Sequence, residues 1–179
     1  MKMLCVFCGS AEGSSPKYLE MARSLGEFMA QNNIGLVYGG ATIGVMGAVA
    51  DAVLSTGGVV IGIIPKTLVN YEIAHPGLTE LHIVEGMHER KKMMYDKSHA
   101  FLSLPGGMGT LDEMFEILTW SQLKLHEKPM FIYNFQGFYD SLLEYLRHAN
   151  KEGFIKPAHM ELLQELKDSA SLKAKIGSL

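Results

Sequence analysis

A glycine-rich turn, with an acidic residue one helical turn further on, is the stretch of this sequence best suited to chemistry. It reads Pro105-Gly106-Gly107-Met108-Gly109-Thr110, and Glu113 follows three residues after the threonine. An apolar run at 100–104 precedes the turn and a segment without Gly or Pro, 111–125, follows it, which predicts a strand, a turn and a helix. Glycines leave backbone N–H groups unshielded, and a helix N-terminus favours an anion. The stretch is therefore predicted to hold a phosphate and to place Glu113 beside it.

The same residues have a structural interpretation. Thr-x-x-Glu is also the pattern of a capping box, with Thr110 as the N-cap and Glu113 as the third helical residue. In that case Glu113 would stabilise the helix start and need not be a catalyst. The turn is not a dinucleotide fingerprint, because Asp112 stands where a third glycine would be. It is not a P-loop either, because no Gly-Lys-Ser/Thr follows.

Apolar runs of strand length alternate with helical segments along the chain. We expect strands at 2–7, 35–38, 59–64, 100–104 and 130–133, and a short strand at 78–84. Helices are expected from Pro16 onward, from 47 to 54, and at 85–98, 111–125 and 138–149, with a loop or lid at 66–76 and short helices after Pro157. This alternation predicts an α/β fold with a parallel sheet, right-handed crossovers and helices on both faces. The length of 179 residues suits one domain, 1–179.

Two more glycine turns follow predicted strands, Gly9-Ser10 after the first and Gly39-Gly40 after the second. In a parallel sheet the ligand lies at the carboxyl ends of the strands. Both turns are therefore expected to meet the turn at 106–110 at that edge. The agreement of three turns points to a phosphate-bearing ligand more strongly than any one of them.

Composition excludes several classes of partner. The net charge is −3 and the pI near 6.2, which argues against nucleic acid bound by bulk charge. No apolar run reaches membrane-spanning length, and the apolar run at 3–7 is too short for a signal peptide, so the cytoplasm is the expected location.

The residue types that commonly bind metals do not form a recognisable site. Cys5 and Cys8 lie within a predicted strand, where residues three apart point to opposite faces, so we expect two buried structural thiols. The seven histidines show no metal-ligand spacing, and no metal site is predicted. The charged segment 88–92 has the pattern of a solvated helix face. It could also supply a cationic clamp for a phosphate or carboxylate.

Three stretches together resemble the Lonely Guy family of cytokinin riboside 5′-monophosphate phosphoribohydrolases, often labelled lysine decarboxylase-like. They are Gly39-Gly40, the segment Met87-His88-Glu89-Arg90-Lys91, and the turn at 105–113, which matches the family signature PGGxGTxxE in full. The resemblance runs from Cys8 to about Pro157. It implies a Rossmann-like fold, a homodimer, and no metal or organic cofactor.

The resemblance also implies an activity. This is hydrolysis of the N-glycosidic bond of an adenine-type nucleoside 5′-monophosphate, giving the free base and ribose 5-phosphate. By motif, Arg90 and Glu113 are the catalytic pair. Contacts from the lid, for instance by Glu72 or Glu85, are not assigned because this part aligns poorly. With the three turns included, the predicted substrate-binding residues are Gly9, Ser10, Gly39, Gly40, Met87, Arg90, Lys91, Gly106, Gly107, Met108, Gly109, Thr110, Glu113 and Thr119.

A second function stays open. A protein of the same fold could bind a nucleotide without catalysis, as a sensor or carrier. The pair of Arg90 and Glu113 favours the hydrolase, because a simple binding protein would not need it. Whether the natural base is adenine or an N6-substituted adenine is not legible in the sequence.

Overall fold

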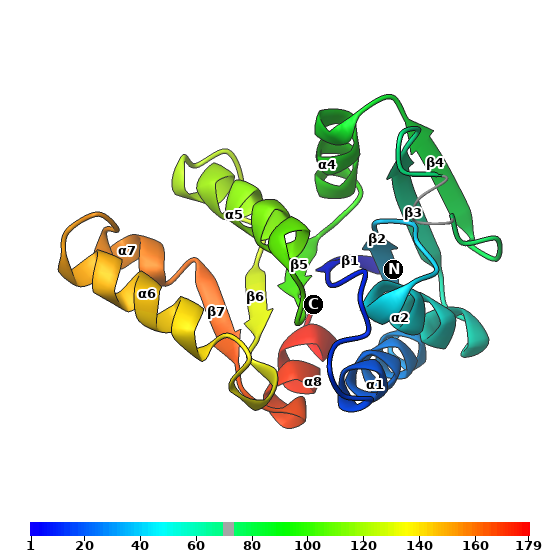
Figure 1. Cartoon of the computed structure of the whole chain (residues 1–179), viewed down its shortest axis with the longest axis horizontal. Helices are drawn as coiled ribbons and strands as arrows, with labels where there is room; N and C mark the ends of the chain where they lie inside the picture. Colours follow the sequence, from blue (N-terminus) through cyan, green and yellow to red (C-terminus); the bar gives the residue numbers. More distant parts are fainter. Residues whose placement is uncertain (70–73) are drawn as a thin grey trace.

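The structure is a computed structural model that describes residues 1–69 and 74–179. Its centre is a seven-stranded sheet in the order β4-β3-β2-β1-β5-β6-β7, in which every neighbouring pair of strands is parallel (Figure 1). The α/β prediction with a parallel sheet is confirmed. The strands are β1 Lys2–Phe7, β2 Ile34–Tyr38, β3 Val60–Pro65, β4 Glu80–Val84, β5 Ala100–Ser103, β6 Met130–Tyr133 and β7 Leu163–Leu166.

Helices cover both faces of the sheet. The first face carries α1 Lys17–Gln31, α2 Gly44–Ser55 and α8 Ser169–Gly177, which supply many residues of one buried apolar cluster. The second face carries α4 Met87–Asp96, α5 Met108–Gln122 and α6 Asp140–Lys151, which enclose a second cluster. The short helices η1 Phe135–Gly137 and α7 Pro157–Met160 complete the described elements. Figure 1 shows the two groups of helices on opposite sides of the strands.

The central strand β1 shows how the sequence builds these two layers. Leu4, Val6 and Cys8 belong to the first apolar cluster, while Cys5 and Phe7 belong to the second. This is the period of two that a strand buried on both sides requires. Both cysteines are buried and free, as predicted, and burial raises the pKa of each thiol.

The C-terminal part differs from the prediction. We expected only short helices after Pro157, but Leu163–Leu166 forms β7 and pairs with β6 at the sheet edge. Its sequence, Leu-Gln-Glu-Leu, has no β-branched residue, so the propensity signal for a strand was weak. The strand forms despite its weak β propensity because it pairs with β6 at the edge of the sheet.

Helix boundaries differ by a few residues. The helix expected at 85–98 is the shorter α4, and the helix expected from residue 111 begins at Met108. Of the expected loop at 66–76, residues 70–73 lie outside the described part, and Glu72 is among them. Within the described residues, no helix is long and apolar enough to span a membrane.

Candidate active site

The turns after β1 and β5 pack directly against each other. The Gly9 N–H donates to the Pro105 carbonyl at 3.2 Å, and a Cβ added at Gly9 would lie 3.3 Å from the Gly106 Cα. A Cβ added at Gly106 would overlap the Thr110 hydroxyl and lie 2.8 Å from the Gly9 nitrogen. Only glycine leaves room for this contact, which brings the first strand's turn to the start of α5.

The start of α5 corrects the capping-box prediction. Gly107 is the N-cap, with φ −100° and ψ −150°, and Met108 is the first helical residue. Thr110 therefore lies inside the first turn and is not the N-cap, so the capping box was wrong. The N–H groups of a helix's first turn have no acceptor within the helix and point along its axis. At α5 those groups belong to Met108, Gly109 and Thr110, as the phosphate hypothesis requires.

Glu113 is paired with Arg90, which comes from a different helix. Arg90 Nη1 lies 3.2 Å from Glu113 Oε1, and both side chains are about nine-tenths buried. Arg90 Nε donates to the Ile63 carbonyl at 3.1 Å. On the other side of the guanidinium, a Cβ added at Gly39 would overlap Arg90 Nη2. The turn after β2, the end of β3 and α5 thus fix the guanidinium from three directions.

These groups line one pocket. Its volume is about 170 Å³, and its walls come from the β1 turn, α2, α4 and the start of α5. Nine predicted residues lie there, namely Gly9, Ser10, Met87, Arg90, Gly107, Met108, Gly109, Thr110 and Glu113. Thr110 and Glu113 are both buried, whereas Met108 is exposed. A carboxylate, a guanidinium and a helix N-terminus therefore share one solvent-reached cavity.

A second cavity of about 220 Å³ adjoins the first and shares Gly9, Ser10 and Gly107 with it. Gly106 lines this second cavity. Its other walls are mostly apolar and include the rings of Tyr18 and Phe138, which lie edge to face with centroids 6.0 Å apart.

Four predicted residues lie elsewhere. Gly39 packs against Arg90 and Gly40 against β3, and neither lines the pocket. Lys91 does not line the pocket and forms ion pairs with Asp112 at 2.8 Å and Glu116 at 3.1 Å, both on α5. Burial alone would lower the pKa of Lys91, but the two carboxylates outweigh it and the pKa is raised.

Thr119 is the fourth of these residues. It lies in an open groove along α5 with Phe115 and Trp120, and its hydroxyl donates to the Phe115 carbonyl at 2.7 Å. This groove shares Asp112 with the pocket that holds Arg90 and Glu113, but Thr119 does not line that pocket.

Sequence reasoning missed several lining residues. Cys8, Met46 and Asp112 line the pocket beside Glu113, and Tyr18, Val45 and Phe138 line the adjoining cavity. The sequence did carry one signal, because Cys8 immediately precedes the turn at Gly9-Ser10. No sequence pattern marked the aromatic and apolar lining residues, because an apolar side chain that lines a cavity has the same spacing as one that is buried in the core. Among the described residues, no group of three or more His, Cys, Asp or Glu could hold a metal ion.

The fold and the site define a class. This is a Rossmann-like α/β protein that presents a helix start in a glycine turn and a buried Arg–Glu pair at the carboxyl ends of its strands. The chain belongs to the family described as "Possible lysine decarboxylase", which matches residues 46–176. The resemblance to the Lonely Guy family is confirmed by the named relatives that follow.

The chain is 46% identical over 178 residues to the cytokinin riboside 5′-monophosphate phosphoribohydrolase of Rhodococcoides fascians, covering 99% of this chain and 90% of that protein. It is 43% identical over 175 residues to the Arabidopsis thaliana protein of that name called LOG1, covering 98% and 82%. Among solved structures, the molybdenum cofactor binding protein of Rippkaea orientalis has a TM-score of 0.74 at 22% identity, covering 99% of this chain and 96% of that one. At this identity the structural likeness supports the fold alone.

Proposed function

We propose that this protein hydrolyses the N-glycosidic bond of adenine-type nucleoside 5′-monophosphates, giving the free base and ribose 5-phosphate. The observation that carries the proposal is the buried pair of Arg90 and Glu113 beside the N-terminus of α5. A binding site for an anion and a fixed carboxylate are the two parts that this reaction needs in one place.

The anion site comes from the helix start. The 5′-phosphate accepts hydrogen bonds from the N–H groups of Met108, Gly109 and Thr110, and the helix dipole favours its charge. The Glu113 backbone lies three residues beyond Thr110, the last of these donors, which is about 4.5 Å along the helix axis at 1.5 Å per residue. A phosphate held at the helix start therefore places the ribose next to the Glu113 carboxylate.

The carboxylate acts on the sugar. As the base leaves, positive charge develops on the ribose ring, as in the oxocarbenium-like state of glycoside hydrolysis. Glu113 supplies negative charge at that point, and a charge fixed in a buried site stabilises the transition state without reorganising. Arg90 orients the carboxylate through its bond to Oε1 and is itself held by the Ile63 carbonyl.

A nucleotide carrier or sensor is the second candidate function, and the solved molybdenum-cofactor proteins share the fold. The Arg90–Glu113 pair favours the hydrolase, because burying two charges is costly and a phosphate-binding site has no need of the carboxylate. Lysine decarboxylation is not proposed. Lys91, the lysine next to the catalytic pair, is held by Asp112 and Glu116 with a raised pKa, which keeps its amine protonated.

The experiment is a product assay on purified protein without added metal. We expect adenine release from AMP and at least 10-fold slower release from adenosine, because loss of the phosphate removes charge-assisted hydrogen bonds of about 1.5–3 kcal/mol each. Equal turnover of AMP and adenosine would refute the phosphate site. Tight AMP binding without base release would favour the carrier.

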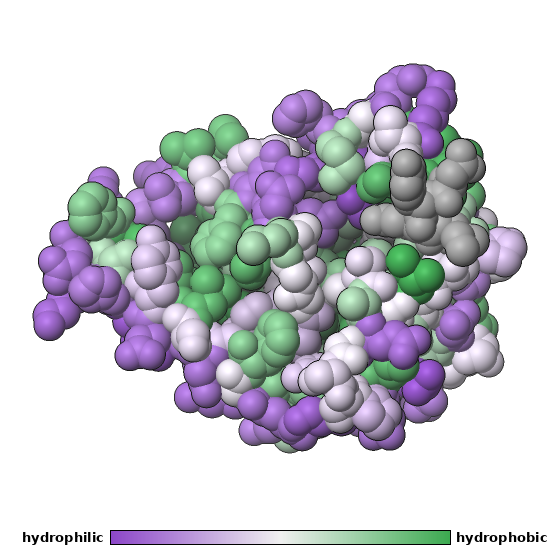
Figure 2. All heavy atoms as spheres, in the orientation of Figure 1, coloured by the Kyte–Doolittle hydropathy of each residue, from purple (hydrophilic) through white to green (hydrophobic). Residues whose placement is uncertain are grey.

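A homodimer in the cytoplasm stays part of the proposal. Hydrophobic side chains gather at the outer end of α5 and between α5 and α6 (Figure 2). Leu123 and Leu125 are exposed there, and Leu111, Phe115 and Trp120 line the open groove along the helix. Apolar surface of this kind is suited to a subunit interface. Light scattering at micromolar concentration measures the oligomeric state directly, and a stable monomer would contradict it.

A further inference from the structure

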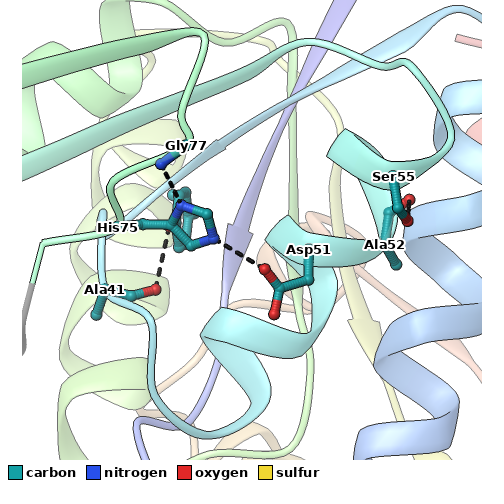
Figure 3. Close-up of polar contacts among 7 residues, drawn as sticks. Ala41, Asp51, Ala52, Ser55, His75 and Gly77 are labelled. Atoms are coloured by element: carbon teal, nitrogen blue, oxygen red, sulfur yellow. Dashed lines mark hydrogen bonds and ion pairs between the residues drawn. The ribbon is translucent and has the colours of Figure 1, made fainter.

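His75 ties the segment that precedes β4 to the turn behind Arg90. Its backbone N–H donates to the Gly40 carbonyl at 2.9 Å, and Ala74 forms an antiparallel bridge with Ala41. Its ring lies against α2, where Nε2 is 2.9 Å from Asp51 Oδ1 (Figure 3). The His75 side chain is 9% exposed and the Asp51 side chain 70%. A buried ring is thus anchored to a carboxylate that reaches it from the surface.

The contacts assign the tautomer of the neutral ring. The Gly77 N–H donates to Nδ1 at 3.1 Å, so Nδ1 is the unprotonated nitrogen. Nε2 therefore carries the proton and donates it to Asp51. The ring is used at both nitrogens, one closing the turn at 75–77 and the other reaching α2. Figure 3 shows both contacts converging on the ring.

The turn that His75 holds packs behind the Arg90 side chain, outside the pocket. A Cβ added at Gly39 would overlap Arg90 Nη2, so the guanidinium packs on the bare Cα of this turn. Gly40 has φ +83° and lies against Ile63 and Ile64 of β3. Because Ile63 also accepts from Arg90 Nε, any shift of the turn relative to β3 changes the spacing between the two supports of the guanidinium.

Asp51, the partner of the His75 ring, is also connected to the site. Asp51 lies on α2, whose start holds the β1 turn. The Met46 N–H donates to the Gly9 carbonyl at 3.2 Å, and the Val45 N–H donates to the Ala11 carbonyl at 3.3 Å. Met46 and Gly9 both line the pocket. One residue thus joins the two glycine turns that come before α4: its backbone N–H holds the second turn, and its ring reaches the first through Asp51 and α2.

We propose that His75, held by Asp51, is a positioning residue that fixes the Gly39-Gly40 turn and through it the Arg90 guanidinium. Its catalytic consequence rests on the proposed hydrolysis, whereas its effect on the turn does not. The alternative is a buried histidine that only satisfies its own polar atoms. A positioning role predicts that removal of the ring speeds amide exchange in the Gly39-Gly40 turn and lowers kcat more than it raises KM. A merely structural histidine predicts neither of these effects.

Three variants separate the contacts of the ring. His75→Ala removes both side-chain hydrogen bonds. In His75→Asn the Oδ1 still accepts the Gly77 N–H, as in an Asx turn, but the reach to Asp51 is lost. Asp51→Ala removes only the carboxylate. His82→Ala is the control, because the His82 side chain pairs with Glu80 at 3.0 Å on β4 and His82 is not among the residues that line the pocket with Arg90 and Glu113.

The first measurement is hydrogen–deuterium exchange of the folded protein, which needs no activity. We expect amides at 39–46 to exchange about 5-fold faster in His75→Ala, the factor that corresponds to one typical hydrogen bond. Asp51→Ala and His75→Asn should show a smaller change in the same segment. Unchanged exchange at 39–46 would overturn the proposal, as would acceleration spread evenly over the chain or equal acceleration in His82→Ala.

The second measurement is the kinetics of adenine release from AMP. Misplacement of a catalytic group lowers kcat more than it weakens ground-state binding, so His75→Ala should lose about 10-fold in kcat with KM within about 3-fold. His75→Asn should recover part of that loss, and the double variant His75→Asn/Asp51→Ala should be no worse than His75→Asn. A His75→Ala protein with normal kcat would overturn the proposal. If the wild-type protein releases no base, the proposed function fails and the exchange result alone decides the role of His75.

Discussion

At the scale of single residues, the structure excludes a capping-box role for Glu113. The capping box that could have explained it required Thr110 as the N-cap, but α5 begins at Met108 and Glu113 is the sixth helical residue. What remains is a buried carboxylate paired with a buried guanidinium, near the helix start that we propose binds the phosphate. Structural pairs of this kind are often replaceable by apolar residues without loss of stability, so a functional reason for keeping the pair is the stronger explanation.

Glu113→Gln is expected to stay folded and to lose base release by roughly 100-fold or more, the usual cost of removing a fixed group that stabilises charge in the transition state. The glutamine amide can still accept the Arg90 hydrogen bond, so the stability cost should be about 1–3 kcal/mol of the ~5–15 kcal/mol of a typical domain. AMP binding should largely survive. Turnover and the melting temperature are measured together.

Glu116→Gln is the control for that prediction. It removes the same charge one turn further along α5, where Glu116 pairs with Lys91 and not with Arg90. Its turnover should stay within a few-fold of wild type. Near-normal turnover in Glu113→Gln would remove Glu113 from the mechanism.

Gly39→Ala tests the wall behind Arg90. The added methyl group would overlap Arg90 Nη2 and lie 3.1 Å from Met46 Sδ, so the guanidinium must leave its place. A displacement of about 1 Å can cost 100-fold in rate, while overpacking costs about 1–3 kcal/mol of stability. We therefore expect a folded protein with turnover reduced about 100-fold, measured with AMP as substrate.

Gly86→Ala serves as the comparison, because a Cβ at Gly86, the N-cap of the helix that carries Arg90, meets no atom within 4 Å in the described structure. It should keep nearly normal turnover. Equal activity of Gly39→Ala and wild type would show that Arg90 need not sit where the structure has it.

At the scale of elements, much of the architecture was predictable and the reasons are local. The buried strands β1, β2, β3, β5 and β6 are short, continuous apolar runs, which the sequence shows directly. The glycine turns that follow β1, β2 and β5 predict that a ligand binds at the carboxyl edge of the sheet. β7 was missed because its pairing with β6 is a tertiary contact that its own four residues do not encode.

The site was predictable only in part, and for a related reason. The turn at 105–110 could be assigned from residue types. Arg90 and Glu113, however, lie 23 residues apart on two helices, and only the family resemblance pointed to their pairing. Lys91, which the same resemblance assigns to substrate binding, is engaged elsewhere in this structure. Two carboxylates at a spacing of four on α5, Asp112 and Glu116, hold it outside the pocket, and no local pattern around Lys91 signals them.

The contact between the β1 and β5 turns yields a prediction for two adjacent glycines. A Cβ at Gly106 overlaps the Thr110 hydroxyl, whereas a Cβ at Gly107 meets nothing within 4 Å and extends into open space at the pocket wall. Gly106→Ala should therefore lose stability, about 2 kcal/mol or a Tm fall of about 4–8 °C. Gly107→Ala should keep its Tm but raise the KM for AMP, because the methyl group takes space beside the phosphate. Thermal melts and kinetics of both variants check this, and an equal Tm for the two would contradict the packing argument.

At the scale of the whole molecule, the core binds several acidic protons that the unfolded chain would release at alkaline pH. Cys5, Cys8, Tyr38 and Tyr139 are buried, and burial raises the pKa of each above its ordinary value. The Tyr38 hydroxyl donates to the Ala41 carbonyl at 3.1 Å and the Tyr139 hydroxyl to the Leu104 carbonyl at 2.6 Å, so both also fix the strand ends that carry the site.

The sign of the pH effect follows from proton counts. In the unfolded chain, cysteines lose their protons above about pH 8.5 and tyrosines above about pH 10. In the folded protein these buried groups stay protonated at the same pH values. The folded state then binds more protons than the unfolded state, so stability falls as pH rises. The stabilisation is fully present below about pH 8.5, and each group loses up to about 1.36 kcal/mol per pH unit above its unfolded pKa. By pH 10 the two thiols alone account for about 4 kcal/mol, a large part of a typical domain's stability.

Denaturant unfolding at pH 7.5, 9 and 10 measures this directly. We expect the free energy of unfolding to fall steeply above pH 8.5 and the native thiols to resist alkylation until the protein unfolds, because a buried protonated thiol is a poor nucleophile. A Cys5→Ala/Cys8→Ala variant starts from lower stability but should lose much less of it between pH 8.5 and 10, since only the tyrosines remain to titrate. A wild-type stability that stays flat to pH 10, or native thiols that react rapidly at pH 8, would show that these side chains are not held protonated in the core, and the packing of β1 between the two helical layers would have to be revised.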